Sequence, residues 1–163
     1  MVKANAKEKT QQDITAVLEA EHRHIEQLFD ALEHTRGASK KAEKSFEELY
    51  KALSLHAYGE ELVVYPAMRD FEQASDYVEE AEEEHNSAKI LLEQMKQLAL
   101  DDEEFHTKLK YLKETMLHHV EEEESEIFPA VRQCMDEKML ILLAQEFEET
   151  KAKMLPEVEE SMK

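Results

Sequence analysis

The chain has 163 residues, of which two are glycine and three are proline, and this scarcity of turn residues excludes all-β folds and favours long helices. Its hydrophobic content of 42% is enough for one core and too high for an acidic disordered segment. Twenty Lys and Arg against 39 Asp and Glu give a formal net charge of −19, so the surface should repel nucleic-acid phosphates and anionic membranes.

The first two helices are bounded by capping residues and turn residues. Thr10 can cap the first helix, with Asp13 in a variant of the capping box, and Gly37 ends it. Ser39 can cap the second helix, which runs toward Pro66. The connection between the two helices is therefore only a few residues long.

The third and fourth helices follow the same logic. Ser75 is the expected cap of the third helix, which runs to about Leu100. Asp101, with Glu104 three residues later, is the expected cap of the fourth, which ends near Pro129.

A fifth helix is predicted over about residues 136–160, opened by Asp136 and disturbed by Pro156. Short connections make neighbouring helices antiparallel, which predicts an all-α, up-down-up-down four-helix bundle with an additional C-terminal helix. Residues 10–163 then form one domain behind a flexible N-terminus of residues 1–9.

Four of these helices carry apolar residues at alternating spacings of three and four, as bundle helices do. Polar residues interrupt each apolar stripe near its middle. The interrupting residues are His22, His56, Glu60, His85, His119 and Glu123.

The interrupting residues recur with a constant offset of 63 positions. The offset relates His22 to His85, His56 to His119, Glu60 to Glu123, Pro66 to Pro129 and Arg69 to Arg132. The chain is therefore two similar helical hairpins, about residues 10–70 and 75–133. Each hairpin has a His on its first helix and, 34 positions later, an H-x-x-x-E motif on its second.

Histidines and glutamates on buried stripes indicate a metal site. A His and a Glu at positions i and i+4 share one helix face, about 6 Å apart along the axis. Buried without partners, such groups cost several kcal/mol each, on the order of the general desolvation penalty. Imidazole nitrogens and carboxylate oxygens are good ligands for Fe, Mn or Zn. Four imidazoles and two carboxylates suit two metal ions, each bound by two His and bridged by both Glu.

The other polar candidates are interpreted as surface or filler residues. His24, His106 and His118 lie off the apolar stripes, and His34 lies near a helix end. Cys134 is the single cysteine; it cannot form an internal disulfide and is interpreted as a small apolar filler.

Four stretches of this sequence resemble the hemerythrin-like, or HHE cation-binding, family: Glu21-His22, residues 56–61 leading to Tyr65-Pro66, Glu84-His85, and residues 118–124 leading to Phe128-Pro129. The resemblance covers about residues 10–155. It implies a four-helix bundle that holds two iron ions with an oxo or hydroxo bridge. It further implies that His22 and His56 bind one iron, that His85 and His119 bind the other, and that Glu60 and Glu123 bridge them.

One position departs from the family pattern. Oxygen-carrying hemerythrins have a fifth His four residues after the His of the third helix, and Lys89 stands there in this chain. Glu26, at the matching position of the first hairpin, is either an extra ligand or exposed, and exposure is favoured. The missing His favours redox turnover of peroxide, O2 or NO over simple reversible oxygen carriage.

The sequence thus predicts a di-iron protein that binds or reduces O2, peroxide or NO, with no catalytic residue beyond the metal ligands. Alternatives are a catalase- or peroxidase-type enzyme that detoxifies peroxide, an iron- or oxygen-sensing module without turnover, and a metal-free structural bundle. A ferritin-like site built on E-x-x-H motifs at Glu19 and Glu82 ranks last. Tyr58, Tyr65 and Tyr111 are candidates for hydrogen bonds to the ligands.

Location and assembly are predicted from composition. The longest apolar run, residues 139–144, is far too short to span a membrane, and the N-terminus lacks the apolar segment of a secretory signal. The single cysteine suits a reducing cytoplasm. We expect a monomer or a weak homodimer, with no nucleic-acid and no membrane partner.

Overall fold

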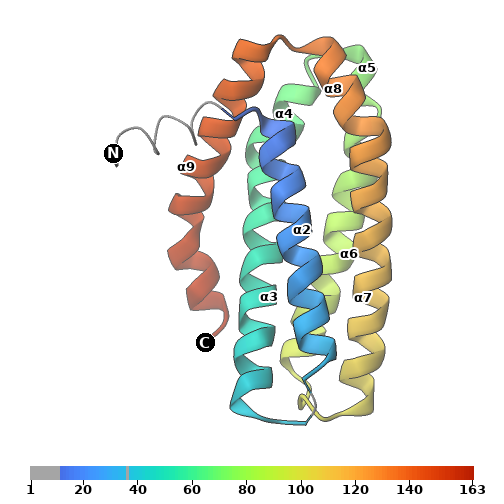
Figure 1. Ribbon diagram of the computed structural model, residues 1–163, viewed down its shortest axis with the longest axis vertical. Helices are drawn as coiled ribbons and strands as arrows, with labels where there is room; N and C mark the ends of the chain where they lie inside the picture. The colour runs from blue at the N-terminus through green and yellow to red at the C-terminus, as the bar shows by residue number, and fades with distance from the viewer. Residues whose placement is uncertain (1–11, 36) are drawn as a thin grey trace.

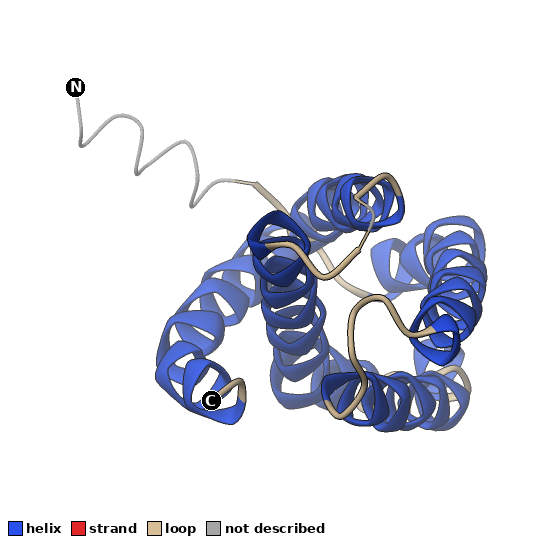
Figure 2. Cartoon of the chain, turned by 90° about the horizontal axis from the view of Figure 1, so that it is seen from below, coloured by secondary structure: helices blue, strands red, loops and turns tan. Residues whose placement is uncertain are grey.

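Helices make up every regular element of the computed structural model, which describes residues 12–35 and 37–163. Four of them form an antiparallel bundle: α2 (Ile14–Glu33), α3 (Lys40–Gly59), α6 (Val78–Lys96) and α7 (Glu103–Glu122). They run side by side in alternating directions (Figure 1) and surround a common centre (Figure 2). A fifth long helix, α9 (Glu137–Ser161), lies outside the bundle against α2 and α3. The predicted bundle with an additional C-terminal helix is confirmed.

Each helix with an H-x-x-x-E motif continues through a wide π-helical turn. The turns and the short helices after them are η1 (Glu60–Val64), α4 (Tyr65–Met68), η2 (Glu123–Ile127) and α8 (Phe128–Cys134). The Tyr65 N–H donates to the Glu60 carbonyl, and the Phe128 N–H donates to the Glu123 carbonyl. The prolines that follow lie in the first turns of α4 and α8, where a missing N–H is tolerated. The helices therefore pass Pro66 and Pro129, near which they were predicted to end.

Side-chain caps begin several helices at the predicted residues. The Ser39 hydroxyl accepts from the Ala42 N–H at 3.1 Å, and the Asp136 carboxylate accepts from the Met139 N–H at 2.9 Å. Both predicted caps are confirmed. Asp13 caps α2, while the predicted first cap, Thr10, and the predicted flexible residues 1–9 lie outside the described residues.

Two predicted caps were wrong. Ser75 is the last residue of the short helix α5 (Glu72–Ser75), so its backbone is already helical and cannot adopt the extended geometry of a cap. The third bundle helix begins after Tyr77 without a side-chain cap and ends at Lys96, before Leu100. In the fourth, Asp102 replaces Asp101, because Asp102 is extended and its carboxylate accepts from the Glu104 N–H at 2.8 Å.

Pro156 does not interrupt the last helix, contrary to the prediction. Helix α9 runs through it to Ser161. A proline leaves the carbonyl four residues earlier without its helical donor. Here that residue is Ala152, which is exposed like Pro156, so water can bond to the free carbonyl.

No helix in the described part of the chain is long and apolar enough to cross a membrane.

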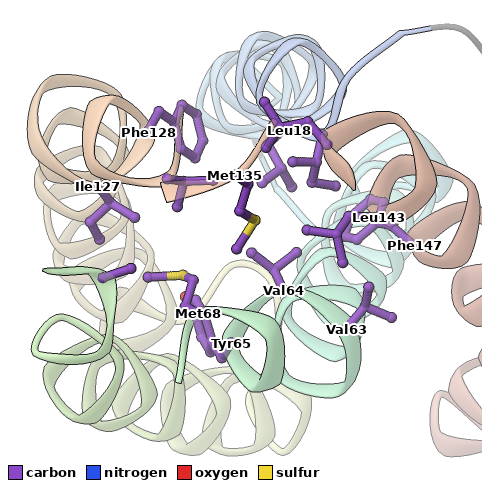
Figure 3. Packing of buried hydrophobic residues seen from close by; sticks show 14 of the residues in the cluster. Leu18, Val63, Val64, Tyr65, Met68, Ile127, Phe128, Met135, Leu143 and Phe147 are labelled. Carbon is purple, nitrogen blue, oxygen red and sulfur yellow. The ribbon is translucent and has the colours of Figure 1, made fainter. Parts of the chain in front are cut away.

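Two apolar clusters fill the bundle on either side of a polar layer. The upper cluster, at the α4 and α8 end, includes Leu18 and Phe128 (Figure 3). The lower cluster includes Ile25 and Phe105. On α2, His22 lies between Leu18 of the upper cluster and Ile25 of the lower one. The polar layer is therefore enclosed by packed apolar side chains at both ends.

Helix α9 packs closely against α3 at Gly59. A Cβ atom there would lie 2.2 Å from Cε1 of Phe147, whose ring is fully buried. We expect Gly59→Ala to lower the free energy of unfolding by about 1–3 kcal/mol through overpacking, despite the helix propensity of alanine. Urea denaturation checks this, and adding Phe147→Leu should restore part of the loss. An unchanged stability of the single variant would contradict the close packing of α9.

Candidate metal centre

The polar layer consists of the six residues that interrupt the apolar stripes. His22 comes from α2, His56 from α3, His85 from α6 and His119 from α7, while Glu60 and Glu123 are the first residues of η1 and η2. All six are buried, and among the described residues Thr15 is the one other buried polar residue. Four helices therefore bring all six predicted residues to one level of the bundle.

The six side chains form two groups that share a glutamate. His22, His56, Glu60 and Glu123 each offer one ligand atom, and these atoms lie within 4.8 Å of one another. Glu60, His85 and His119 form the second group by the same measure. The pairing of His22 with His56 and of His85 with His119 is the one that the family resemblance implied.

The two glutamates lie between the groups. Oε1 of Glu60 is 3.3 Å from Nε2 of His56 and 3.0 Å from Nε2 of His85. Glu123 reaches Nε2 of His22 at 2.9 Å with Oε1, and Nε2 of His119 at 3.5 Å with Oε2. Each carboxylate thus contacts a histidine of both groups, as a bridging ligand must.

Three buried polar atoms in this layer have no hydrogen-bond partner in the protein and are potential metal ligands. Nε2 of His56, Nε2 of His119 and Oε2 of Glu60 are buried and have no hydrogen-bond partner. An unsatisfied buried polar atom costs about 1–3 kcal/mol. Imidazole nitrogen and carboxylate oxygen both donate lone pairs to transition metals, so the donor set fits metal ions at this place.

Four further glutamates orient the histidines. Each accepts a hydrogen bond from the Nδ1 atom of one imidazole, which leaves the Nε2 lone pair facing the centre. The Nδ1-to-carboxylate distances are 2.7 Å for His22–Glu124, 2.8 Å for His56–Glu21, 2.9 Å for His85–Glu61 and 2.6 Å for His119–Glu84. The sequence prediction missed this role, although the offset of 63 that relates the ligands also relates Glu21 to Glu84 and Glu61 to Glu124.

Two of these outer carboxylates also form ion pairs with basic side chains. Arg23 donates to Glu124 at 2.7 Å, and Lys151 of α9 donates to Glu21. The centre therefore contacts the fifth helix through one outer carboxylate.

Tyr65 breaks the similarity of the two hairpins. Its hydroxyl lies 3.2 Å from both Oε1 of Glu60 and Nε2 of His85. Burial and the negative charge of Glu60 raise the pKa of Tyr65, so the hydroxyl keeps its proton. Phe128, at the matching position, stacks on His22 with ring centroids 5.9 Å apart. Of the three predicted tyrosines, Tyr111 is exposed and Tyr58 lies at the edge of the bundle.

Without metal, three of the buried histidines hold a proton more strongly than a free imidazole does. Burial alone would lower the pKa of His56, but the charge of Glu60 and the hydrogen bond to Glu21 raise it to about 10. The neighbouring glutamates likewise raise the pKa of His85 and His119 against the effect of burial. Burial would raise the pKa of Glu60, but the charge of His56 holds it well below its usual value. Metal ions must therefore displace protons from this layer.

The model of the hemerythrin HHE cation-binding domain matches residues 13–131 of this chain. The chain belongs to the hemerythrin HHE cation-binding family. A solved structure of an HHE cation-binding domain-containing protein from Mycobacterium kansasii superposes with a TM-score of 0.78 over 93% of this chain and 95% of that one, at 20% identity. That likeness shows the fold of the family.

Two curated relatives are longer than this hemerythrin-like chain. A protein of Nostoc sp. named DNA nickase is 32% identical over 146 residues, which are 90% of this chain and 41% of that protein. An uncharacterized hemerythrin-like protein of Schizosaccharomyces pombe is 30% identical over 101 residues, or 61% of this chain and 50% of that protein. The chain thus spans half or less of each relative. Because one of them is named a nickase, the exclusion of nucleic acid stays a prediction.

The remaining candidates of the hemerythrin-like chain lie outside the two ligand groups. His24, His106 and His118 are exposed, and His34 caps α2. Glu26 is half-buried, pairs with Arg23 at 3.1 Å and belongs to neither ligand group. Cys134 is half-buried against the upper cluster, as an apolar filler would be.

The two E-x-x-H glutamates form ion pairs at the surface. Glu19 contacts Arg132 at 3.3 Å, and Glu82 contacts Arg69 at 2.7 Å. The offset of 63 relates Glu19 to Glu82 and Arg69 to Arg132, so ion pairing with arginine explains why these glutamates recur. The geometry therefore disfavours a ferritin-like site at these positions.

Proposed function

We propose that this hemerythrin-like chain binds two iron ions in the polar layer and uses them to bind or reduce O2, peroxide or NO. The observation that carries the proposal is the set of three buried atoms without a hydrogen-bond partner, which come from both hairpins. In this proposal His22 and His56 hold one ion, His85 and His119 hold the other, and Glu60 and Glu123 bridge them.

The chain supplies orientation, a largely apolar environment and a hydrogen-bond donor. Bound iron would supply Lewis acidity and one-electron redox chemistry. The outer glutamates hold the Nδ1 protons, so each imidazole presents Nε2 inward. The two apolar clusters limit access of bulk water to the layer. The Tyr65 hydroxyl, 3.2 Å from Nε2 of His85, places an O–H donor beside the ligands.

Peroxide turnover is the second candidate function, and one position favours it. Lys89, where oxygen-carrying hemerythrins have their fifth His, is exposed and lies outside both ligand groups. The second ion would then have one protein ligand fewer, which leaves room for a reactant. Oxygen evolution from added peroxide distinguishes a catalase-type enzyme from a binding protein.

The setting of the protein belongs to the same proposal. The single cysteine supports a reducing, cytoplasmic compartment. The net charge of −19 supports a monomer or a weak homodimer without a nucleic-acid partner.

Metal content tests the proposal directly. Protein purified without chelator should contain about two irons per chain, because six His and Glu ligands suit two ions. An oxo bridge between the irons should give absorption bands in the near ultraviolet. Absence of metal, or zinc that iron cannot replace, would contradict the redox function. Loss of helicity on chelation without any turnover would instead support a sensing role.

A further inference from the structure

A cavity of about 220 Å³ lies between α3 and α6 and reaches the metal centre. Its wall includes His56 and His85, one histidine from each ligand group. The rest of the wall combines apolar residues, among them Ala57, Ala88 and Leu92, with the charged residues Glu61, Lys89 and Glu93. At about 30 Å³ per water molecule, the space holds several small molecules but is smaller than a drug-sized site.

The interface between α3 and α6 differs in side-chain volume from the matching interface between α2 and α7. The offset of 63 relates Ala57 to Val120, Ala88 to Ile25 and Leu92 to Phe29. The three larger residues are buried in the lower cluster beside His22 and His119. The space beside His56 and His85 therefore follows from smaller side chains between α3 and α6 than between α2 and α7.

The C-terminal end of α9 covers part of the cavity. Val158, which is buried, contributes to its wall together with Ser161. Lys96 of α6 donates to the carbonyl of Ser161 at 2.5 Å, and Lys51 of α3 pairs with Glu159 at 3.4 Å. These contacts hold the last turns of α9 to both helices that border the cavity.

We propose that this cavity is the access route and holding space for a small uncharged reactant of the centre, such as O2, NO or peroxide. The inference rests on the proposed function, since it needs a reactive centre at His56 and His85. The apolar part of the wall, which includes Ala57, Ala88 and Leu92, suits uncharged molecules of a few heavy atoms, and the cavity volume of about 220 Å³ excludes bulky ones.

The matching residues between α2 and α7 suggest the test variants. Ala88→Ile places in the cavity the side chain that Ile25 has at the matching position, and Ala57→Val is a milder second variant. Both should keep the iron content and lower the rate constant of NO binding by the reduced, iron-loaded protein about tenfold. Ala52→Val is the matched control, because Ala52 lines the groove on the α2 and α9 side of α3.

Xenon under pressure gives a readout that needs no iron. Crystals of the wild-type protein should bind xenon in the cavity, and crystals of Ala88→Ile should not. Full iron content with an unchanged NO rate in both cavity variants would overturn the access route, as would a larger effect of Ala52→Val. Absence of iron from the wild-type protein would instead contradict the proposed function.

Discussion

Glu60→Ala is expected to abolish binding of both metal ions, although it removes a single side chain. Glu60 belongs to both ligand groups, and its Oε1 atom contacts a histidine of each. Its removal would leave each ion with fewer ligands and leave the imidazoles of His56 and His85 without a buried counter-charge. Breaking a buried ion pair in this way costs about 3–5 kcal/mol.

Iron per chain after identical purification measures the effect, and far-ultraviolet circular dichroism verifies that the bundle remains folded. Glu60→Gln is the conservative companion, because it keeps the volume and removes the charge. Glu26→Ala is the matched control, since Glu26 pairs with Arg23 outside both groups, and it should retain full metal content. Full metal content in Glu60→Ala would show that the layer does not share this carboxylate.

Metal binding should release protons, and acid should release the metal. In the metal-free protein the pKa of His56 is about 10, and those of His85 and His119 are also raised. At neutral pH His56 is therefore protonated, and the raised pKa values of His85 and His119 favour their protonated forms. Each imidazole must lose its proton before its nitrogen can bind a metal. Metal uptake at pH 7 should therefore release protons, at least one of them from His56, and the affinity should fall as the pH falls.

Calorimetric titration in buffers of different ionisation enthalpy counts the released protons. His106→Ala is a suitable control, because His106 is exposed and belongs to none of the groups that could hold a metal, and it should not change the count. Release of no protons would mean that these histidines are neutral before the metal arrives. The metal-free fold has the opposite pH dependence: its ion pairs stabilise it at neutral pH and are lost as the pH rises through about 10 for His56.

The sequence was sufficient to predict the bundle and the residues of the polar layer, for a physical reason. Burying a histidine such as His22 in the middle of an apolar stripe costs free energy unless the imidazole has a partner. The offset of 63 shows that the same unfavourable placement occurs twice in the chain, which indicates that these residues have a common partner. The sequence signals for the first residues of helices were less reliable. Ser75 resembles a cap in sequence, but the extra helical turn of α5 occupies it, and no local pattern distinguishes Asp101 from Asp102.

Other features depend on three-dimensional packing. In a chain with 39 acidic residues, Glu61 and Glu84 do not stand out, and only the fold shows which carboxylates reach an imidazole. The wide turns at Glu60 and Glu123 replace helix ends that the prolines had suggested. The cavity depends on the volumes of residues such as Ala88 and Ile25, whose effect is visible only after the helices are packed together.

The outer cations give the two halves of the centre different electronic character. Arg23 and Lys151 neutralise the carboxylates behind His22 and His56, whereas within residues 12–35 and 37–163 no lysine or arginine forms an ion pair with Glu61 or Glu84. A carboxylate without a counter-ion draws the Nδ1 proton more strongly and makes the imidazole a better electron donor. In the proposed di-iron centre, an ion held by His85 and His119 would therefore be oxidised more easily than its neighbour, so a duplicated hairpin would give two unequal positions.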